Sequence, residues 1–168
     1  EIRDGIVADI AIQAALTGHL VFSTLHTNDA PSAITRLIDM GVKPFLVASS
    51  IQAIMAQRLV RIICKKCRTV DDNCDPKLLK SLDITPEQLQ KTPVYKGTGC
   101  SQCQNTGYKG RIAIFEMFEM NTEIRELAFS KAPTTELRKA SRAGGMQTLR
   151  DDGIRKVFNG VTTPEEVV

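Results

Sequence analysis

Four of the five cysteines form two C-x-x-C pairs, Cys64 with Cys67 and Cys100 with Cys103. Two intervening residues give the tight turn that places both thiolates against one Zn²⁺, and two such turns close a tetrahedral shell. A shell of four cysteines has no open position, so we expect a structural zinc site without catalysis. Residues 68–99 make a longer spacer than the roughly 15–20 residues usual for this pattern. Loop-closure entropy grows only slowly with length, so the spacer is compatible with the site.

Other uses of these thiols are disulfides, a redox pair and unlinked buried cysteines. Disulfides are disfavoured because the acidic start of the chain has no apolar signal region. A thioredoxin-like motif explains one C-x-x-C pair but not two. We expect the fifth cysteine, Cys74, to be a bystander.

Cations flank both pairs, namely Arg61, Lys65, Lys66, Arg68, Lys109 and Arg111. Four thiolates around Zn²⁺ carry a net negative charge, which these cations offset while they lower the thiol pKa values. A nucleic-acid-binding zinc ribbon is a second interpretation. We expect no nucleic-acid binding, because aromatic residues make up only 5% of the chain, Trp is absent and the net charge is only +3.

The composition is that of a globular protein rather than a disordered or membrane-spanning one. The 168 residues are 42% hydrophobic and 24% charged, enough apolar material for a sizeable core. No run of about 18 apolar residues occurs.

Apolar periodicity predicts the elements before the cysteine pairs. We expect a helix over 6–18, a buried strand over 19–25, and helices over 33–40 and 44–62. Helix, strand and helix in this order predict an α/β fold with a parallel sheet, whose partner strand we expect upstream of residue 1.

Further helices are predicted between the cysteine pairs and after them. Thr85 and Gln88 have the spacing of a capping box at the start of a small helix. Residues 111–168 read as helices, and Thr163 begins a helix-start pattern in which Glu166 reaches back to the N-cap. Because that pattern stands at the very end of the chain, we hypothesise that the chain is part of a longer protein.

Glu1 and His26 carry little information singly, since a terminal acid is ordinarily solvated and His26 could close a polar strand. Their order along the chain with the other motifs is more specific. The ordered set comprises Glu1-Ile2-Arg3-Asp4, the run from Gly18-His19-Leu20 through Thr24-Leu25-His26-Thr27-Asn28, Ala56-Gln57-Arg58-Leu59-Val60-Arg61, the two cysteine pairs, Gly107-Tyr108-Lys109-Gly110-Arg111, Gly145-Met146, Leu149-Arg150, Asp152-Gly153 and Gly160–Val167. The whole chain resembles the hexameric secretion ATPases of bacterial type II secretion and type IV pilus assembly.

This resemblance implies roles for particular residues. Glu1 matches the carboxylate of the Walker B segment, and His26 matches the family's His box, which faces the terminal phosphate of the nucleotide. Cys64, Cys67, Cys100 and Cys103 match the tetracysteine zinc subdomain that distinguishes assembly and secretion motors from retraction motors. The resemblance implies three parts, with 1–62 as the C-terminal part of a RecA-like P-loop ATPase core, 63–110 as the tetracysteine zinc subdomain and 111–168 as a helical C-terminal subdomain.

The implied parent is a cytoplasmic homo-hexamer that uses ATP and Mg²⁺ and docks at the inner membrane through secretion or pilus platform proteins. No Walker A motif occurs in 1–168, so we assign no nucleotide-binding residues. We also expect the isolated chain to be inactive in ATP hydrolysis. The alternative is a zinc-stabilised module that binds a partner without catalysis.

Overall fold

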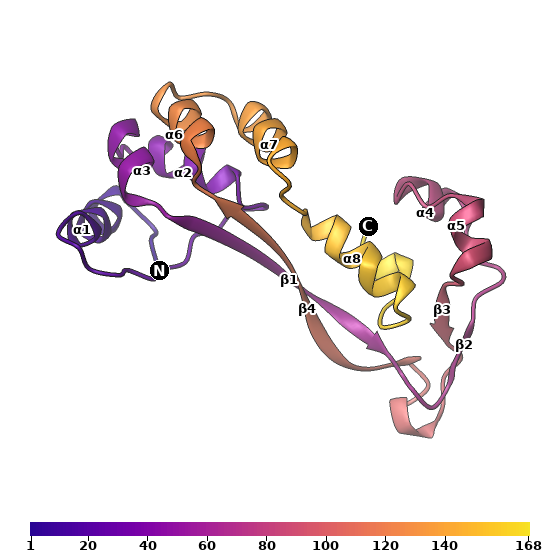
Figure 1. Ribbon diagram of the computed structural model, residues 1–168. Helices are drawn as coiled ribbons and strands as arrows, with labels where there is room; N and C mark the ends of the chain where they lie inside the picture. Colours follow the sequence, from indigo (N-terminus) through magenta and orange to yellow (C-terminus); the bar gives the residue numbers. More distant parts are fainter. The chain divides into compact units, whose positions relative to one another are not determined.

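The computed structural model describes all 168 residues, and its contacts divide them into two compact units (Figure 1). The units comprise Glu1–Ala56 with Glu116–Gln147 (unit 1) and Gln57–Phe115 with Thr148–Val168 (unit 2). Two long strands, β1 (Ala53–Ile63) and β4 (Tyr108–Glu119), pair with each other. The boundary between the units falls within both strands, so each unit is assembled from two separate stretches of chain.

Five helices pack in unit 1. They are α1 (Gly5–Leu16), α2 (Ser32–Asp39), α3 (Pro44–Ser50), α6 (Thr122–Phe129) and α7 (Thr134–Ala143). Their apolar faces meet the end of β4 in one core, whose larger buried members are Ile34, Leu37, Val47, Phe118, Ile124 and Leu137. Burial of these side chains is the main force that holds the short helices together, because isolated helices of this length are marginal in water.

Side-chain caps fix where two of these helices begin. The Asp4 carboxylate accepts from Val7 N (2.9 Å) at the start of α1. The Asn121 side chain accepts from Ile124 N (2.9 Å) at the start of α6. Such caps satisfy backbone donors that have no partner within the helix.

Unit 2 combines short strands with short helices. They are β2 (Arg68–Val70), α4 (Pro76–Ser81), α5 (Pro86–Lys91), β3 (Tyr95–Gly97), the 3₁₀ turn η1 (Ser101–Cys103), α8 (Leu149–Phe158) and the 3₁₀ turn η2 (Pro164–Glu166). Strands β2 and β3 pair antiparallel, with Thr69 opposite Lys96. A small apolar cluster consists of Leu79, Leu82 and Ile84 with Ile154, Phe158 and Val167 packed against it.

Arg61 fastens the last residues of the chain to β1. Its Nη2 and Nε atoms donate to Glu166 Oε1 (2.6 and 3.0 Å), and its backbone N–H donates to Glu166 Oε2 (2.8 Å). The guanidinium also stacks over the Tyr108 ring, 4.1 Å from the centroid. The Tyr108 hydroxyl lies 2.9 Å from Thr163 Oγ1, so one cluster joins β1, β4 and the C-terminal turn.

Several predicted elements are confirmed. Helix α1 covers most of the predicted 6–18, α2 covers the predicted 33–40, and α5 begins with the predicted capping box between Thr85 and Gln88. The helices after residue 120 are also present. None of the helices has both the length and the apolar character that crossing a membrane requires.

The predicted buried strand over 19–25 is wrong for this chain. The segment forms neither helix nor strand, and Leu20 and Phe22 are 79% and 87% exposed. A strand needs a ladder of bonds to a neighbour, but a single bond from Ile2 N to Thr24 O (2.8 Å) holds this segment beside the N-terminus. The predicted parallel sheet is therefore not formed within these residues, whose two sheets are β1–β4 and the antiparallel β2–β3.

The predicted helix over 44–62 and the helical reading of 111–119 are also wrong. Helix α3 ends at Ser50, and β1 and β4 occupy the remaining residues. Buried positions alternate near the end of β4, at Ile114, Glu116 and Phe118. Local apolar periodicity did not reveal this pairing because the two strands lie far apart in sequence.

The predicted start of the last turn is confirmed, but the predicted capping contact is wrong. The turn η2 follows Thr163 as predicted, yet Thr163 makes no side-chain cap. Glu166 turns to Arg61 instead of reaching back. A charge-assisted bond to a guanidinium is stronger than a bond to a neutral backbone N–H.

Asp152 is the buried carboxylate that joins α8 to β4. It accepts from Phe115 N (2.9 Å), Lys156 Nζ (2.6 Å) and Arg155 Nη2 (2.5 Å). Burial acts to raise the pKa of Asp152, but the bonds from Lys156, Phe115 and Arg155 outweigh it and lower the pKa. The ionised form therefore stabilises the fold above the pKa of an unfolded Asp and loses that contribution in acid.

Replacing Asp152 with Ala should lower the free energy of unfolding at neutral pH by roughly 3 kcal/mol, since it leaves Lys156 without its buried anion. Denaturant unfolding measures the effect, with Asp72→Ala as a matched control at an exposed position. The difference from wild type should begin to shrink below roughly pH 4, the pKa of an unfolded Asp. It should be lost as the pH falls through the lowered pKa of folded Asp152. A loss no larger than that of the control would contradict this account.

Candidate functional site

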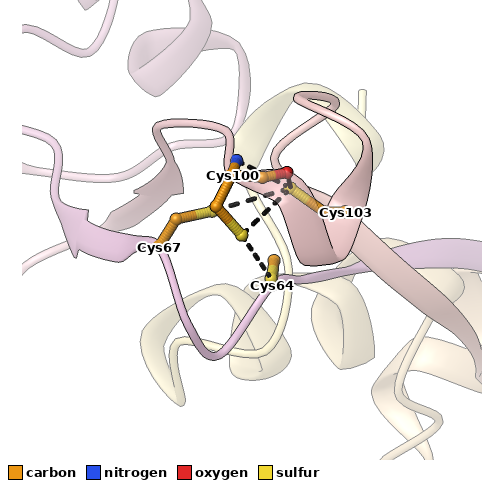
Figure 2. A group of neighbouring side chains, drawn as sticks. All are labelled: Cys64, Cys67, Cys100 and Cys103. Carbon is orange, nitrogen blue, oxygen red and sulfur yellow. Dashed lines mark hydrogen bonds between the residues drawn. The ribbon is translucent and has the colours of Figure 1, made fainter.

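The four cysteines of the two C-x-x-C pairs converge on one point in unit 2. Cys64 directly follows β1 and Cys67 directly precedes β2, while Cys100 directly precedes the η1 turn and Cys103 is its last residue. Cys64 Sγ lies 3.8 Å from Cys100 Sγ, Cys67 Sγ lies 3.8 Å from Cys103 Sγ, and the sulfurs of Cys100 and Cys103 are 3.7 Å apart. Figure 2 shows the four side chains gathered in this way, and all four sulfurs lie within 4.8 Å of one another.

These distances fit a tetrahedral metal site. Four sulfurs at roughly 2.3 Å from a central Zn²⁺ are separated by about 3.8 Å along each edge of the tetrahedron. Disulfide-bonded sulfurs would be only about 2.05 Å apart, and all five cysteines are free. The cluster is therefore consistent with a structural metal such as zinc.

Backbone hydrogen bonds hold the two turns in place. The Cys64 N–H donates to Gly107 O (2.9 Å), and the Thr98 N–H donates to Cys67 O (3.0 Å). The Cys100 N–H donates to Cys103 Sγ (3.2 Å), as expected for a sulfur that carries negative charge. The turns are thus positioned by the strands around them as well as by each other.

The protein environment shifts the pKa values of two of the four thiols in opposite directions. Burial raises the pKa of Cys67 to about 11. Burial acts in the same direction on Cys103, but bonds from the backbone N–H groups of Cys100 and Gly107 and from neighbouring thiols lower the pKa of Cys103 to about 6. The thiols must lose their protons to ligate a metal, and this environment favours the thiolate at Cys103 and the protonated thiol at Cys67.

Only some of the cations expected to balance the cluster are free to do so. Arg61 is engaged with Glu166, while Arg68 stacks on Tyr95 (4.9 Å) and donates to Gly160 O (3.2 Å). The other four cations are exposed, namely Lys65, Lys66, Lys109 and Arg111.

Cys74 does not join the tetracysteine cluster. Its sulfur lies near carboxylate oxygens of Asp71 and Glu165. Burial, together with the charges of Glu165 and Asp71, raises the pKa of Cys74 to about 11.

Glu1 and His26 are brought together in unit 1. His26 Nε2 lies 2.6 Å from Glu1 Oε1, and Arg3 Nη2 donates to Glu1 Oε2 (2.7 Å). Since a carboxylate only accepts, Nε2 is the protonated ring nitrogen. The bond from Arg3 lowers the pKa of Glu1, with a further contribution from His26. The His26 side chain is 88% exposed and that of Glu1 is 28% exposed, so both can be reached from solvent.

Comparison with known proteins identifies the family. A family model described as type II/IV secretion system protein matches residues 1–168. The chain belongs to this family. It is 48% identical over 168 residues to the type IV pilus assembly ATPase PilB of Thermus thermophilus. It is 44% identical over 168 residues to the type II secretion system ATPase E of Vibrio cholerae.

The chain matches only part of each relative. All of it aligns in both cases, but it covers 19% of the Thermus protein and 33% of the Vibrio protein. Among solved structures, the pilus retraction motor PilT with bound ADP superposes with a TM-score of 0.64 at 24% identity, over 100% of this chain and 37% of that one. The mixed α/β fold is therefore shared with part of a motor ATPase.

Three charged residues that hold the segment after His26 were not singled out from the sequence. Asp29 lies in that segment and pairs with Arg138, and Glu116 accepts from the neighbouring Ala30 N–H. The available signal was Glu116, a lone acid in the apolar run from Ile112 to Phe118. An acid in such a position is ordinarily buried with a partner.

We expect the purified protein to hold about one equivalent of zinc per chain, and Cys100→Ser to lower this below half because three ligands bind the metal less tightly than four. Metal analysis with mass spectrometry measures the content. Cys74→Ser is the matched control and should retain zinc, since Cys74 lies outside the cluster. Full zinc in Cys100→Ser, or loss in Cys74→Ser, would refute the assignment.

Gly97 and Gly107 allow two backbone segments beside the cysteines to touch. A Cβ atom built on Gly97 would lie 2.0 Å from Gly107 O, and Gly107 itself has a φ of +79°. Only glycine permits this approach, and Gly107 O also accepts from Cys64 N.

Gly97→Ala should therefore push the two turns apart, weaken zinc retention against a chelator and cost roughly 1–3 kcal/mol of stability. Gly144→Ala serves as the control, because its Cβ would make its nearest contact at 3.4 Å. Chelator competition and thermal melting measure the two effects. Equal behaviour of both variants would show that the close approach does not support the cluster.

Proposed function

We propose that this chain is the part of a hexameric cytoplasmic ATPase that couples ATP hydrolysis to type II secretion or type IV pilus assembly. The family and the named relatives support the class of protein. The observation that carries the catalytic assignment is the 2.6 Å contact between His26 Nε2 and Glu1 Oε1, which unites two residues from separate segments.

Glu1 and His26 have complementary chemistry for this reaction. Phosphoryl transfer depends mainly on positioning and on charge stabilisation, so a carboxylate that orients water or holds Mg²⁺ is required. Glu1 is kept ionised by Arg3 and suits this role. The His26 side chain is exposed, and its Nε2–H, which bonds Glu1 in this structure, can instead donate to a phosphate oxygen and respond to the loss of that phosphate.

Nucleotide binding is proposed to need residues beyond these 168. No Walker A motif occurs in the chain, and that loop supplies the backbone amides and the lysine that cradle phosphates. We assign residues 1–62 to the C-terminal part of a RecA-like core, 63–110 to the zinc subdomain and 111–168 to a C-terminal subdomain. The parent is proposed to form a homo-hexamer on inner-membrane platform proteins.

A zinc-stabilised partner-binding module is the second candidate function. It is favoured by the closed set of four sulfurs, which leaves no position for a substrate. In this case the 168 residues transmit force or bind a partner, and the chemistry lies elsewhere. Both candidates predict zinc, but only the first requires Glu1 and His26 for hydrolysis.

We expect Glu1→Gln and His26→Ala in the full-length ATPase to lower kcat for ATP hydrolysis by roughly 100-fold or more, because both groups act on the reacting phosphate. Zinc content should be unchanged. Glu126→Gln provides the matched control, since Glu126 is an exposed residue of α6 outside the family motifs.

Normal hydrolysis by both variants would remove the catalytic assignment and favour the partner-binding module. The 168-residue chain assayed alone should not turn over ATP. Turnover at the rate of the full-length ATPase would contradict the proposal that further residues hold the nucleotide.

A further inference from the structure

The position of His26 depends on the backbone that carries it. Its side chain is 88% exposed and is hydrogen-bonded to Glu1, so packing does little to orient the ring. The short loop from His26 to α2 must hold the imidazole in place. Two contacts from distant parts of the chain fix this loop.

The first contact is an ion pair between Asp29 and Arg138 of α7. Arg138 donates to Asp29 Oδ2 from both Nε (3.0 Å) and Nη2 (2.5 Å). The other oxygen, Asp29 Oδ1, accepts from Ser32 N (3.0 Å) and from the Ser32 hydroxyl. One carboxylate thus ties the loop to the start of α2 and to α7 at once, and both of its oxygens are used.

The second contact comes from Glu116 of β4. The Ala30 N–H donates to Glu116 Oε1 (2.6 Å), and Glu116 is only 4% exposed. A buried carboxylate is costly unless its partners are in place, so this contact strongly specifies the position of Ala30. A third link, between Thr35 and Thr134 (3.0 Å), holds α2 against the start of α7.

We infer that Arg138 and Glu116 are positioning residues for His26, acting through Asp29 and Ala30. The inference rests on the proposed function, in which His26 acts on the terminal phosphate. Neither residue touches the imidazole. They hold the loop from two elements, α7 and β4, that lie far from it in sequence. A ring displaced by about 1 Å can lose a large part of its catalytic effect, so release of the loop should impair hydrolysis more than nucleotide binding.

The test uses Arg138→Ala in the full-length ATPase. We expect kcat to fall by roughly 10- to 100-fold while KM for ATP changes less than about twofold. Arg142→Ala is the matched control, because Arg142 lies one turn further along α7 with an exposed side chain. It should keep wild-type kcat. Arg138→Lys retains the charge but not the two-point contact, and should restore activity only in part.

A double variant decides whether Arg138 acts through His26. If it does, Arg138→Ala should cause no further loss in a His26→Ala background, whereas independent effects would multiply. Multiplied losses would overturn the inference, as would wild-type kcat in Arg138→Ala. Asp29→Asn removes the charge that pairs with Arg138 but keeps the shape of the side chain, so this variant is less prone to unfold than an alanine variant. Wild-type kcat in Asp29→Asn would also overturn the inference.

Failure of the inference and failure of the proposed function are separable. An inactive His26→Ala with a fully active Arg138→Ala overturns only the positioning role. A fully active His26→Ala overturns the catalytic assignment, and the positioning role falls with it. Melting temperature and zinc content, measured for every variant, show whether a loss of kcat arises from an otherwise intact protein.

Discussion

The convergence of four sulfurs is the constraint on which unit 2 depends. Cys64 and Cys67 lie on one turn, Cys100 and Cys103 lie on another, and residues 68–99 separate them. Thiolates crowded at these distances repel one another unless a cation lies between them. A bound metal would turn that repulsion into a crosslink, and the strands that carry the turns, β1 to β4, would be fixed with them. A module this small has little apolar core, so a metal crosslink is an effective source of stability.

Buried or half-buried carboxylates also join segments that lie far apart in the sequence. Asp152 joins α8 to β4, Glu166 joins the C-terminal turn to β1, and Asp29 joins the loop after His26 to α7. Each accepts from a backbone N–H as well as from a cation. The backbone bond specifies a position along the chain, which a surface ion pair alone does poorly. These acids therefore determine which segments meet in each unit.

The sequence predicted the features that depend on short spacings. The cysteine pairs, the capping box at Thr85 and the helices with apolar stripes all follow from residues a few positions apart. The pairing of β1 with β4 could not be predicted from such short spacings, because it is set by contacts between strands that lie on either side of the cysteine turns. The strand expected over 19–25 failed for the same reason, since apolar residues make a strand only beside a partner. Motifs alone singled out Glu1, His26 and the four cysteines as candidates, whereas Asp29, Glu116 and Arg138 became visible only in the fold.

The interleaved make-up of the two units bears on the order in which the chain can fold during synthesis. Unit 1 needs Phe118, Ile124 and Leu137 for its core, and these residues leave the ribosome after Cys103. All four cysteines of the cluster are therefore synthesised before helices α6 and α7 of unit 1. Domains ordinarily fold from the N-terminus onward as they emerge. Here residues 1–56 obtain their partners in unit 1, residues 116–147, only after the chain has passed through the cysteine turns and returned.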